Sequence, residues 1–180
     1  MKFREAPLAG AYVIEPERVT DARGSFTRTF CTREFEARGL VTRLAQCSES
    51  RNTQTGTLRG LHYQASPYAE AKTVRCIAGS AHDVIVDLRR DSPTRWRWFA
   101  LKLDARAGTA LYIPPGFAHG FMTLEPETTL EYWISEHYVP EAARGVRFDD
   151  PVLAIKWPLI PSVVSERDRN LPFVSELEDV

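Results

Sequence analysis

Two of the four histidines stand in short runs whose composition suits chemistry. His62 lies in Arg-Gly-Leu-His-Tyr-Gln, which begins at Arg59, and His119 lies in Pro-Pro-Gly-Phe-Ala-His-Gly. Imidazole titrates near neutrality, so such a residue can act as a general base, and it is also a common metal ligand. Because Arg59 and Lys72 are close to His62 in the sequence, we expect a cation-rich pocket beside this imidazole. Such a pocket suits an anionic substrate and a developing oxyanion.

The two remaining histidines, His82 and His137, lack such neighbours. A histidine outside a chemistry-bearing run is more often a hydrogen-bonded structural residue than a catalyst. We therefore expect structural roles for both.

A metal site is the first alternative for these runs. The Pro-x-Gly-x-x-His pattern that ends at His119 loosely matches the second half of the metal-binding pattern of cupin barrels. The first half normally offers His-x-His followed by a carboxylate, whereas here His62 is followed by Tyr-Gln and then by Glu70. One expected imidazole is missing, but two histidines and a glutamate can still form a facial triad, so a metal-dependent cupin enzyme stays open.

Short β-strands are the elements that must position these groups. Three runs alternate apolar with polar residues, and their apolar faces are formed by Val84, Val86 and Leu88, by Phe99, Leu101 and Leu103, and by Leu130, Tyr132 and Ile134. Asp83 and Asp87 take the opposite, wet face of the first run. Turn signals separate the runs at residues 78–80, 91–93, 107–108 and 114–116. This spacing predicts an all-β protein, a double-sheet jelly roll.

The non-strand segments are few. A short helix is predicted over residues 32–38, with Thr32 as its N-cap and Gly39 after its end. Residues 157–180 carry prolines and several charges, which predicts irregular or helical structure folded over the barrel, with frayed final residues. With 180 residues, of which 43% are hydrophobic, the chain has material for one core. We therefore expect a single domain over residues 1–180.

Charge and cysteine content exclude several classes of function. The net charge of −1 comes from 23 basic and 24 acidic residues, with no block of like charge suited to nucleic acid or to a membrane surface. The start of the chain has no apolar region typical of an export signal. We therefore expect a cytoplasmic protein. Three cysteines without close pairing predict reduced, mostly buried thiols: Cys31, Cys47 and Cys76.

Many ordered runs between Asp21 and Asp168 resemble one known family. They are Asp-Ala-Arg-Gly-Ser-Phe at 21–26, Leu-Arg-Gly-Leu-His-Tyr-Gln at 58–64, Lys-Thr-Val-Arg at 72–75, and the runs at 83–88, 92–94, 113–121, 149–151, 155–158 and 165–168. On these runs the chain resembles the dTDP-4-dehydrorhamnose 3,5-epimerases. The resemblance implies a cupin-type double-stranded β-helix that uses no metal or other cofactor. It also implies a homodimer whose N-terminal strands help complete the partner's active site.

The resemblance implies inversion of C3, C5 or both, next to the C4 ketone of a nucleotide-linked 6-deoxy sugar such as dTDP-4-dehydro-6-deoxyglucose. By this likeness His62 is the base, Asp168 its orienting partner, Tyr132 the acid on the opposite face of the ring, and Lys72 the cation that holds the enolate oxygen. Without the resemblance, Tyr132 would be interpreted as a core residue and Asp168 as part of a solvated charged run.

The resemblance also implies substrate contacts, with guanidinium groups suited to the diphosphate. The residues matched to binding positions are Arg23, Phe26, Gln46, Arg59, Lys72, His119, Tyr138 and Arg167. The second alternative is a non-catalytic sugar-nucleotide-binding jelly roll, in which His62 and Tyr132 only pack against their neighbours and transfer no proton.

Three positions depart from the pattern of the thymidine-nucleotide enzymes. Arg28 stands where the family usually has glutamate, Ser48 where asparagine is common, and Ala143 where a glutamate often follows the Tyr-x-Pro segment. All three lie where substrate is bound rather than where protons move. We therefore hypothesise an epimerase whose nucleotide or sugar differs from dTDP-4-dehydro-6-deoxyglucose.

Overall fold

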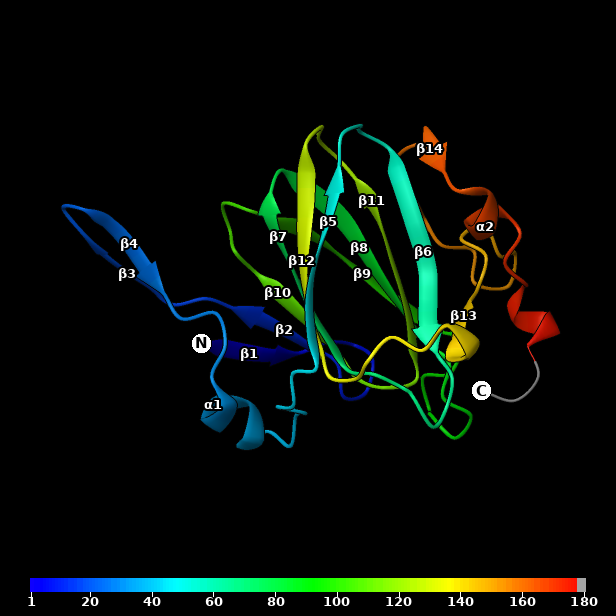
Figure 1. The fold of residues 1–180 in the computed structure, drawn as a ribbon, viewed down its shortest axis with the longest axis horizontal. Helices are drawn as coiled ribbons and strands as arrows, with labels where there is room; N and C mark the ends of the chain where they lie inside the picture. Colours follow the sequence, from blue (N-terminus) through cyan, green and yellow to red (C-terminus); the bar gives the residue numbers. More distant parts are fainter. Residues whose placement is uncertain (178–180) are drawn as a thin grey trace.

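The computed structural model describes residues 1–177, whose strands form two facing antiparallel sheets (Figure 1). In order across the first sheet, the strands are β1 (Lys2–Glu5), β2 (Tyr12–Glu15), β10 (Ala110–Ile113), β7 (Lys72–Ala78), β12 (Thr128–Ile134) and β5 (Gln46–Asn52). Those of the second sheet are β13 (Ala143–Gly145), β6 (Thr57–Gln64), β11 (Phe117–Thr123), β8 (Ser80–Asp87) and β9 (Trp98–Asp104), with β14 (Val163–Val164) parallel to β6. The predicted jelly roll is confirmed.

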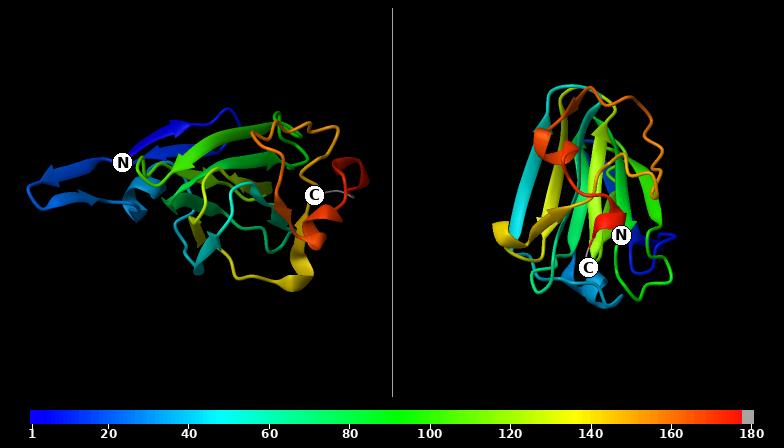
Figure 2. Two further views of the ribbon diagram at one scale, coloured as in Figure 1. Left: turned by 90° about the horizontal axis from the view of Figure 1, so that it is seen from above. Right: turned by 90° about the vertical axis from the view of Figure 1, so that its right-hand side faces the viewer.

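A hairpin stands apart from both sheets. Strands β3 (Arg18–Asp21) and β4 (Gly24–Thr27) pair with each other. Figures 1 and 2 show this hairpin projecting from the N-terminal end of the molecule. Its paired strands carry large apolar side chains that are exposed, Val19 at 70% and its cross-strand partner Phe26 at 76%.

The main core lies between the sheets. Its buried members are Leu8, Ala11, Val13, Val74, Cys76, Ala81, Ile85, Leu103, Leu111, Ile113, Phe117, Phe121 and Leu130. Phe99, Leu101 and Tyr132 pack against this core, so the two inward faces predicted for β9 and β12 are confirmed. The apolar side chains from both inner faces interdigitate, as in other stacked sheets.

Strand β8 differs from its predicted pattern of one wet and one dry face. Val84 and Val86 pack in a second cluster on the outer side of their sheet, while Ala81 and Ile85 face the main core. The expectation that Asp83 and Asp87 face water is wrong, because both are fully buried. Asp87 is tolerated there because Arg89 and Thr94 donate hydrogen bonds to it. Asp83 is tolerated because His119 donates to its Oδ2, although its Oδ1 has no partner among the described residues.

The short helix α1 covers the outer face of the first sheet. It spans Thr32–Glu36, and its N-cap is Cys31 rather than the predicted Thr32, which is the first helical residue. Gly39 follows the helix with φ +67°, a conformation that glycine adopts without steric cost. Phe35 of α1 is fully buried and packs edge-on against Tyr112 of β10.

The C-terminal segment covers the outer face of the second sheet, as predicted, and Figure 2 shows it lying over that side of the molecule. The segment holds β14, helix α2 (Glu166–Arg169) and the 3-10 helix η2 (Val174–Glu176); a further 3-10 turn, η1 (Pro140–Ala142), precedes β13. Trp98 donates its indole N–H to the Leu153 carbonyl at 2.9 Å. The predicted fraying concerns residues 178–180, which lie outside the described residues.

The three cysteines are free thiols, as predicted, but not all are buried. Cys76 is buried and Cys31 partly so, whereas Cys47 is exposed on the edge strand β5. Burial raises the pKa of the Cys76 thiol to about 11. Within residues 1–177, no helix has the length and apolar character needed to cross a membrane.

Candidate active site

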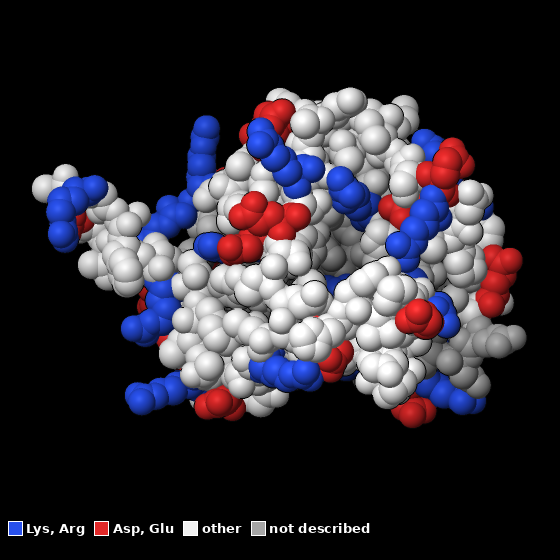
Figure 3. Space-filling model, viewed as in Figure 1, with Lys and Arg blue, Asp and Glu red and all other residues white. Residues whose placement is uncertain are grey.

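Two adjoining hollows open between the ends of the two sheets. They hold about 230 Å³ and about 180 Å³, and both are lined by His62, Lys72 and Ile134. The larger, which we call the inner hollow, is also lined by Arg59, His119, Gly120, Phe121 and Tyr132. The smaller, the outer hollow, extends to Gln46, Tyr63, Gln64, Glu70, Glu136, Tyr138, Ala143, Arg144 and Arg167. Figure 3 shows the molecule hollowed on this face, with Lys and Arg side chains on the rim.

Close approach of β6 to β11 sets the floor of the inner hollow. A Cβ added to Gly60 would lie 2.6 Å from the Gly120 Cα and 2.8 Å from the His119 carbonyl oxygen. A Cβ on Gly120 would lie 2.6 Å from the Arg59 carbonyl oxygen. Only glycine fits at either position. This approach places His62 directly across the sheet from His119.

His62 is held by a carboxylate from another part of the chain. Its Nε2 lies 2.7 Å from Asp168 Oδ1 on α2, and Asp168 Oδ2 accepts a hydrogen bond from the Gly60 N–H at 3.1 Å. Ser165 is the N-cap of α2 and accepts from the Asp168 N–H. Burial alone would raise the pKa of the Asp168 carboxyl, but the hydrogen bonds from His62 and Gly60 outweigh it and hold this pKa below its usual value.

A second histidine and carboxylate pair lies beside the first. His119 Nε2 is 2.8 Å from Asp83 Oδ2, and both side chains are buried. The ring of His119 contacts the ring of Tyr132 edge-on, with 5.8 Å between centroids. Since His62 and His119 come from the second sheet and Tyr132 from the first, the phenol faces the two imidazoles across the interior.

The surroundings of Tyr132 favour the protonated form of its phenol. Burial raises the pKa of its phenol well above the usual value, and the negative charge of Asp83 raises it further. A phenol of this kind can donate a proton or a hydrogen bond throughout the neutral range.

Lys72 stands where the two hollows join. It is the first residue of β7, and its ammonium lies 2.8 Å from Glu70 Oε1 and 3.4 Å from the His62 carbonyl oxygen. The side chains of Lys72 and Glu70 are 13% and 6% exposed. A cation in so enclosed a place interacts with nearby charge much more strongly than it would in bulk solvent.

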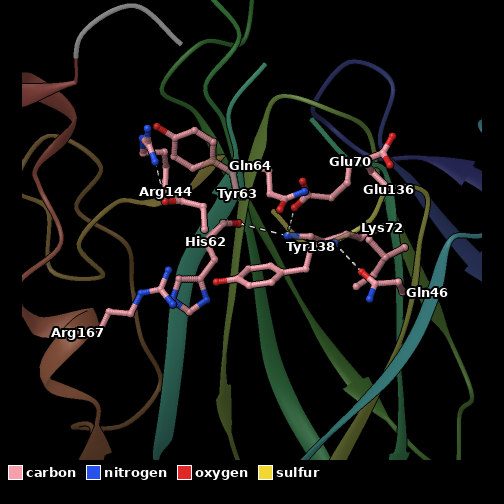
Figure 4. A pocket seen from close by; sticks show the side chains of 12 residues that line it. Gln46, His62, Tyr63, Gln64, Glu70, Lys72, Glu136, Tyr138, Arg144 and Arg167 are labelled. Carbon is pink, nitrogen blue, oxygen red and sulfur yellow. Dashed lines mark hydrogen bonds and ion pairs between the residues drawn. The ribbon is translucent and has the colours of Figure 1, made fainter. Parts of the chain in front are cut away.

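The outer hollow has a wall that glutamines hold in place (Figure 4). Gln46 accepts a hydrogen bond from the Tyr138 N–H at 2.7 Å. Gln64 accepts from the Val139 N–H at 2.7 Å and donates to the His137 carbonyl at 3.1 Å. In Figure 4 the Tyr138 ring and the Arg167 guanidinium turn toward His62. The loop before η1 therefore presents an aromatic face next to cations, an arrangement suited to a nucleotide.

Three guanidinium groups flank the hollows. Arg59 donates to Asn52 Oδ1 at 2.8 Å, and Arg144 donates to the backbone carbonyls of Glu141 and Ala143. Arg167 on α2 is exposed at the rim. Such groups bind phosphate oxygens bidentately.

The alternative metal triad is not assembled. His62 faces Asp168, His119 faces Asp83, and Glu70 faces Lys72. In the part of the chain that the structure describes, no group of three His, Cys, Asp or Glu side chains is arranged to hold a metal ion. The donor set therefore does not fit the metal-dependent alternative.

The structure brings together nine of the residues singled out in the sequence: His62, Tyr132, Asp168, Lys72, Gln46, Arg59, His119, Tyr138 and Arg167. It does not bring in Arg23 and Phe26, which are exposed on the projecting hairpin and line neither hollow of their own chain. Among the departing positions, Ala143 lines the outer hollow. Arg28 pairs with Glu34 at 3.5 Å, and Ser48 is exposed on β5.

Sequence reasoning gave no role to Asp83, Arg144 or Glu136, and it weighed Glu70 only as a metal ligand. An acidic residue in an apolar run is a signal for a buried, partnered carboxylate, so Asp83 could have been found. Glu136 and Arg144 carry no comparable signal, because charged residues are common in loops and on short edge strands.

Comparisons with known proteins point to one family. A sequence model of the family described as dTDP-4-dehydrorhamnose 3,5-epimerase matches residues 5–176. A dTDP-4-dehydrorhamnose 3,5-epimerase of Sinorhizobium fredii is 40% identical over 178 residues, 98% of this chain and 91% of that protein. A dTDP-4-dehydrorhamnose 3-epimerase of Streptomyces niveus is 38% identical over 180 residues, 99% of this chain and 86% of that protein.

A solved structure extends the comparison to a ligand complex. The dTDP-6-deoxy-D-glucose-3,5-epimerase of Legionella pneumophila, in complex with dTDP-4-keto-L-rhamnose, superposes with a TM-score of 0.92 at 35% identity. The match covers 98% of this chain and 94% of that one.

Proposed function

The chain belongs to the dTDP-4-dehydrorhamnose 3,5-epimerase family, and from this membership we propose that it is a carbohydrate epimerase. Its substrate is a nucleoside-diphosphate 4-keto-6-deoxy sugar, and it inverts a carbon next to the ketone. The observation that carries the proposal is the meeting of His62 with its Asp168 partner, Lys72 and Tyr132 around one hollow.

Inversion needs a base and an acid on opposite faces of the ring. Because Asp168 accepts from the Nε2 side of His62, Nδ1 of His62 is the nitrogen that takes the proton, and the carboxylate stabilises the resulting imidazolium. Tyr132 returns a proton from the facing sheet. The raised pKa of its phenol keeps that proton available.

The intermediate is an enolate, whose negative oxygen requires a fixed positive partner. Lys72 supplies that charge from the junction of the hollows, where few water molecules can screen it. His119, held by Asp83, contacts the sugar ring beside Tyr132.

The sugar occupies the inner hollow and its junction with the outer hollow beside Lys72, and the nucleotide occupies the rest of the outer hollow. Tyr138 and Gln46 contact the nucleoside, while Arg59 and Arg167 bind the diphosphate. Support comes from the aromatic and cationic lining of this hollow and from relatives whose names specify dTDP-linked sugars.

The protein acts as a homodimer in the cytoplasm. The exposed apolar pair of Val19 and Phe26 on the β3–β4 hairpin fits a partner subunit, because exposed apolar patches commonly mark such interfaces. An exchanged hairpin delivers Arg23 and Phe26 to the partner's outer hollow. This arrangement accounts for their distance from the hollows of their own chain.

Proton exchange with solvent tests the proposal. The protein is incubated in D2O with several 4-keto nucleotide sugars, and mass spectrometry counts the deuterium atoms incorporated. We expect incorporation with the wild type, two atoms for 3,5-inversion and one for inversion of a single carbon, and none with His62→Asn. His82→Gln, a histidine outside the hollows, serves as the matched control. Binding without exchange would instead identify a non-catalytic sugar-nucleotide-binding protein.

A further inference from the structure

Glu70 has a carboxylate oxygen that the mechanism above does not use. Its side chain is 6% exposed and lines the outer hollow beside Lys72 (Figure 4). Oε1 holds the Lys72 ammonium at 2.8 Å. Oε2 is buried and has no hydrogen-bond partner among the described residues. A buried acceptor without a donor is rare in folded proteins because it loses its hydration without replacement.

In the other carboxylate that lines this hollow, both oxygens accept hydrogen bonds. Glu136 Oε2 accepts from Arg43 at 2.8 Å, and its Oε1 accepts from the His137 N–H at 2.8 Å and from Arg43 at 3.3 Å. Glu70 therefore differs from its neighbour in having a buried acceptor beside the hollow that no described residue uses, within reach of a ligand group after a small shift of the side chain.

The ligand group that suits this acceptor is a hydroxyl. A diphosphate has only acceptors at neutral pH and is repelled by a carboxylate, so it lies toward the guanidinium groups instead. Lys72 and Glu70 together present a donor next to an acceptor. That pair is complementary to an α-hydroxyketone, whose ketone oxygen accepts from Lys72 while the neighbouring hydroxyl donates to Glu70.

We propose that Glu70 is a specificity-determining residue that binds the hydroxyl next to the ketone of the substrate, while its other oxygen positions Lys72. This inference rests on the proposed function. A 4-keto sugar carries such a hydroxyl on C3, whereas C5 carries the ring oxygen and a methyl carbon but no hydroxyl. Glu70 therefore selects substrates that bear the C3 hydroxyl against 3-deoxy analogues.

The test compares two substrates that both retain the C5 proton. They are a 4-keto-6-deoxyglucose and its 3-deoxy counterpart, each on the nucleoside diphosphate that the wild type accepts. For both sugars kcat/KM is measured for deuterium exchange at C5, or at C3 if the wild type labels only that carbon. We expect the wild type to favour the hydroxylated sugar about tenfold or more, since hydrogen bonds to charged groups are strong. In Glu70→Gln this preference should fall to within about twofold. Glu136→Gln should keep it.

Two results would overturn the proposal: a wild type that does not discriminate, or a Glu70→Gln variant that keeps the full preference. If Glu70→Gln does not fold, Glu70→Asp withdraws the carboxylate by one methylene and is expected to lose the preference in the same way. A wild type that exchanges neither the C3 nor the C5 proton of either sugar on any nucleotide would contradict the proposed function itself. Exchange with equal preference would contradict only the assignment of Glu70.

Discussion

His62 Nε2 and Asp168 Oδ1 lie 2.7 Å apart although 106 positions separate them in the chain. The contact joins a strand of the second sheet to a one-turn helix of the C-terminal segment. Asp168 is buried and also accepts from the Gly60 N–H. The carboxylate is therefore fixed from two sides, and it fixes the imidazole in turn.

Asp168→Asn should slow proton exchange by about 100-fold or more, because an amide neither fixes the tautomer of His62 nor stabilises its imidazolium. The measurement is the initial rate of deuterium incorporation, with circular dichroism to verify the fold. Ser165→Ala is the control, since it removes the N-cap of α2 but keeps the carboxylate. An Asp168→Asn enzyme of unchanged rate would contradict the orienting role.

Tyr132→Phe should separate exchange from inversion. His62 can still remove a proton and return it to the same face, so deuterium incorporation is expected to stay within about tenfold of wild type, while inversion falls by about 10² to 10⁴. Nuclear magnetic resonance spectra of the product distinguish the two outcomes. Tyr138→Phe removes a phenol from the outer hollow and should keep inversion. Normal inversion by Tyr132→Phe would exclude this phenol as the acid.

His82 should make stability depend on pH. Burial lowers the pKa of its imidazole below the usual 6.5, and its Nε2 has no partner among the described residues. The unfolded chain therefore binds a proton more readily than the folded protein. The free energy of unfolding is unaffected by His82 above about pH 6.5 and falls as the pH decreases toward the pKa of His82 in the folded protein, by up to about 1.4 kcal/mol per pH unit. The free energy of unfolding is measured with urea between about pH 7.5 and about pH 5. Over this range it should fall more steeply for the wild type than for His82→Gln.

Exposed His137 provides the matched control for that comparison. His137→Gln should follow the wild-type curve. Parallel curves for wild type and His82→Gln would show that protonation of His82 does not contribute to acid sensitivity.

The hypothesis of a different nucleotide rests mainly on Ala143, because Arg28 pairs with Glu34 and neither Arg28 nor Ser48 lines either hollow of its own chain. Ala143 lines the outer hollow without the acceptor that a glutamate would supply, and Arg28 presents a cation where the family usually has an acid. We expect thermal-shift titrations with dTDP, UDP, CDP, ADP and GDP to show no strong preference for dTDP. Strong and selective stabilisation by dTDP would contradict the hypothesis that the nucleotide differs, although not the epimerase activity.

Mixed dimers test the exchanged hairpin. Copies carrying His62→Asn and copies carrying Arg23→Ala should each have low activity, but in a heterodimer one site combines an intact His62 with an intact Arg23 from the partner. Refolding the two variants together in equal amounts should therefore restore about a quarter of wild-type activity, since half of the dimers are mixed and half of their sites are intact. If Arg23 acted within its own chain, mixing would restore nothing.

Local patterns predicted the fold well. Alternation along β9 and β12 predicted their inward faces, including that of Tyr132, because the side-chain period of a strand is visible in sequence. The same rule failed for Asp83, since β8 is covered on both faces and its polar residues are buried in pairs. Alternation predicts opposite faces but does not predict what covers each one.

The site was harder to predict because its contacts are distant in sequence. The pair of His62 and Asp168 followed from family likeness, not from any local pattern. Charge alone could not show that Glu70 would hold Lys72 instead of a metal ion. The position of Arg23 outside the hollows depends on how the hairpin leaves the sheets, which no run of residues specifies.

The residues shared by the two hollows have a consequence for how the substrate specificity of such enzymes can change. His62 and Lys72 belong to both hollows, whereas Tyr132 lines only the inner one and Ala143 only the outer one. Substitutions in the outer hollow can therefore alter which nucleotide carries the sugar, while the side chains that transfer protons keep their positions. A library confined to Gln46, Tyr138, Ala143 and Arg144 would be a rational starting point for redirecting this scaffold to sugars on unnatural carriers.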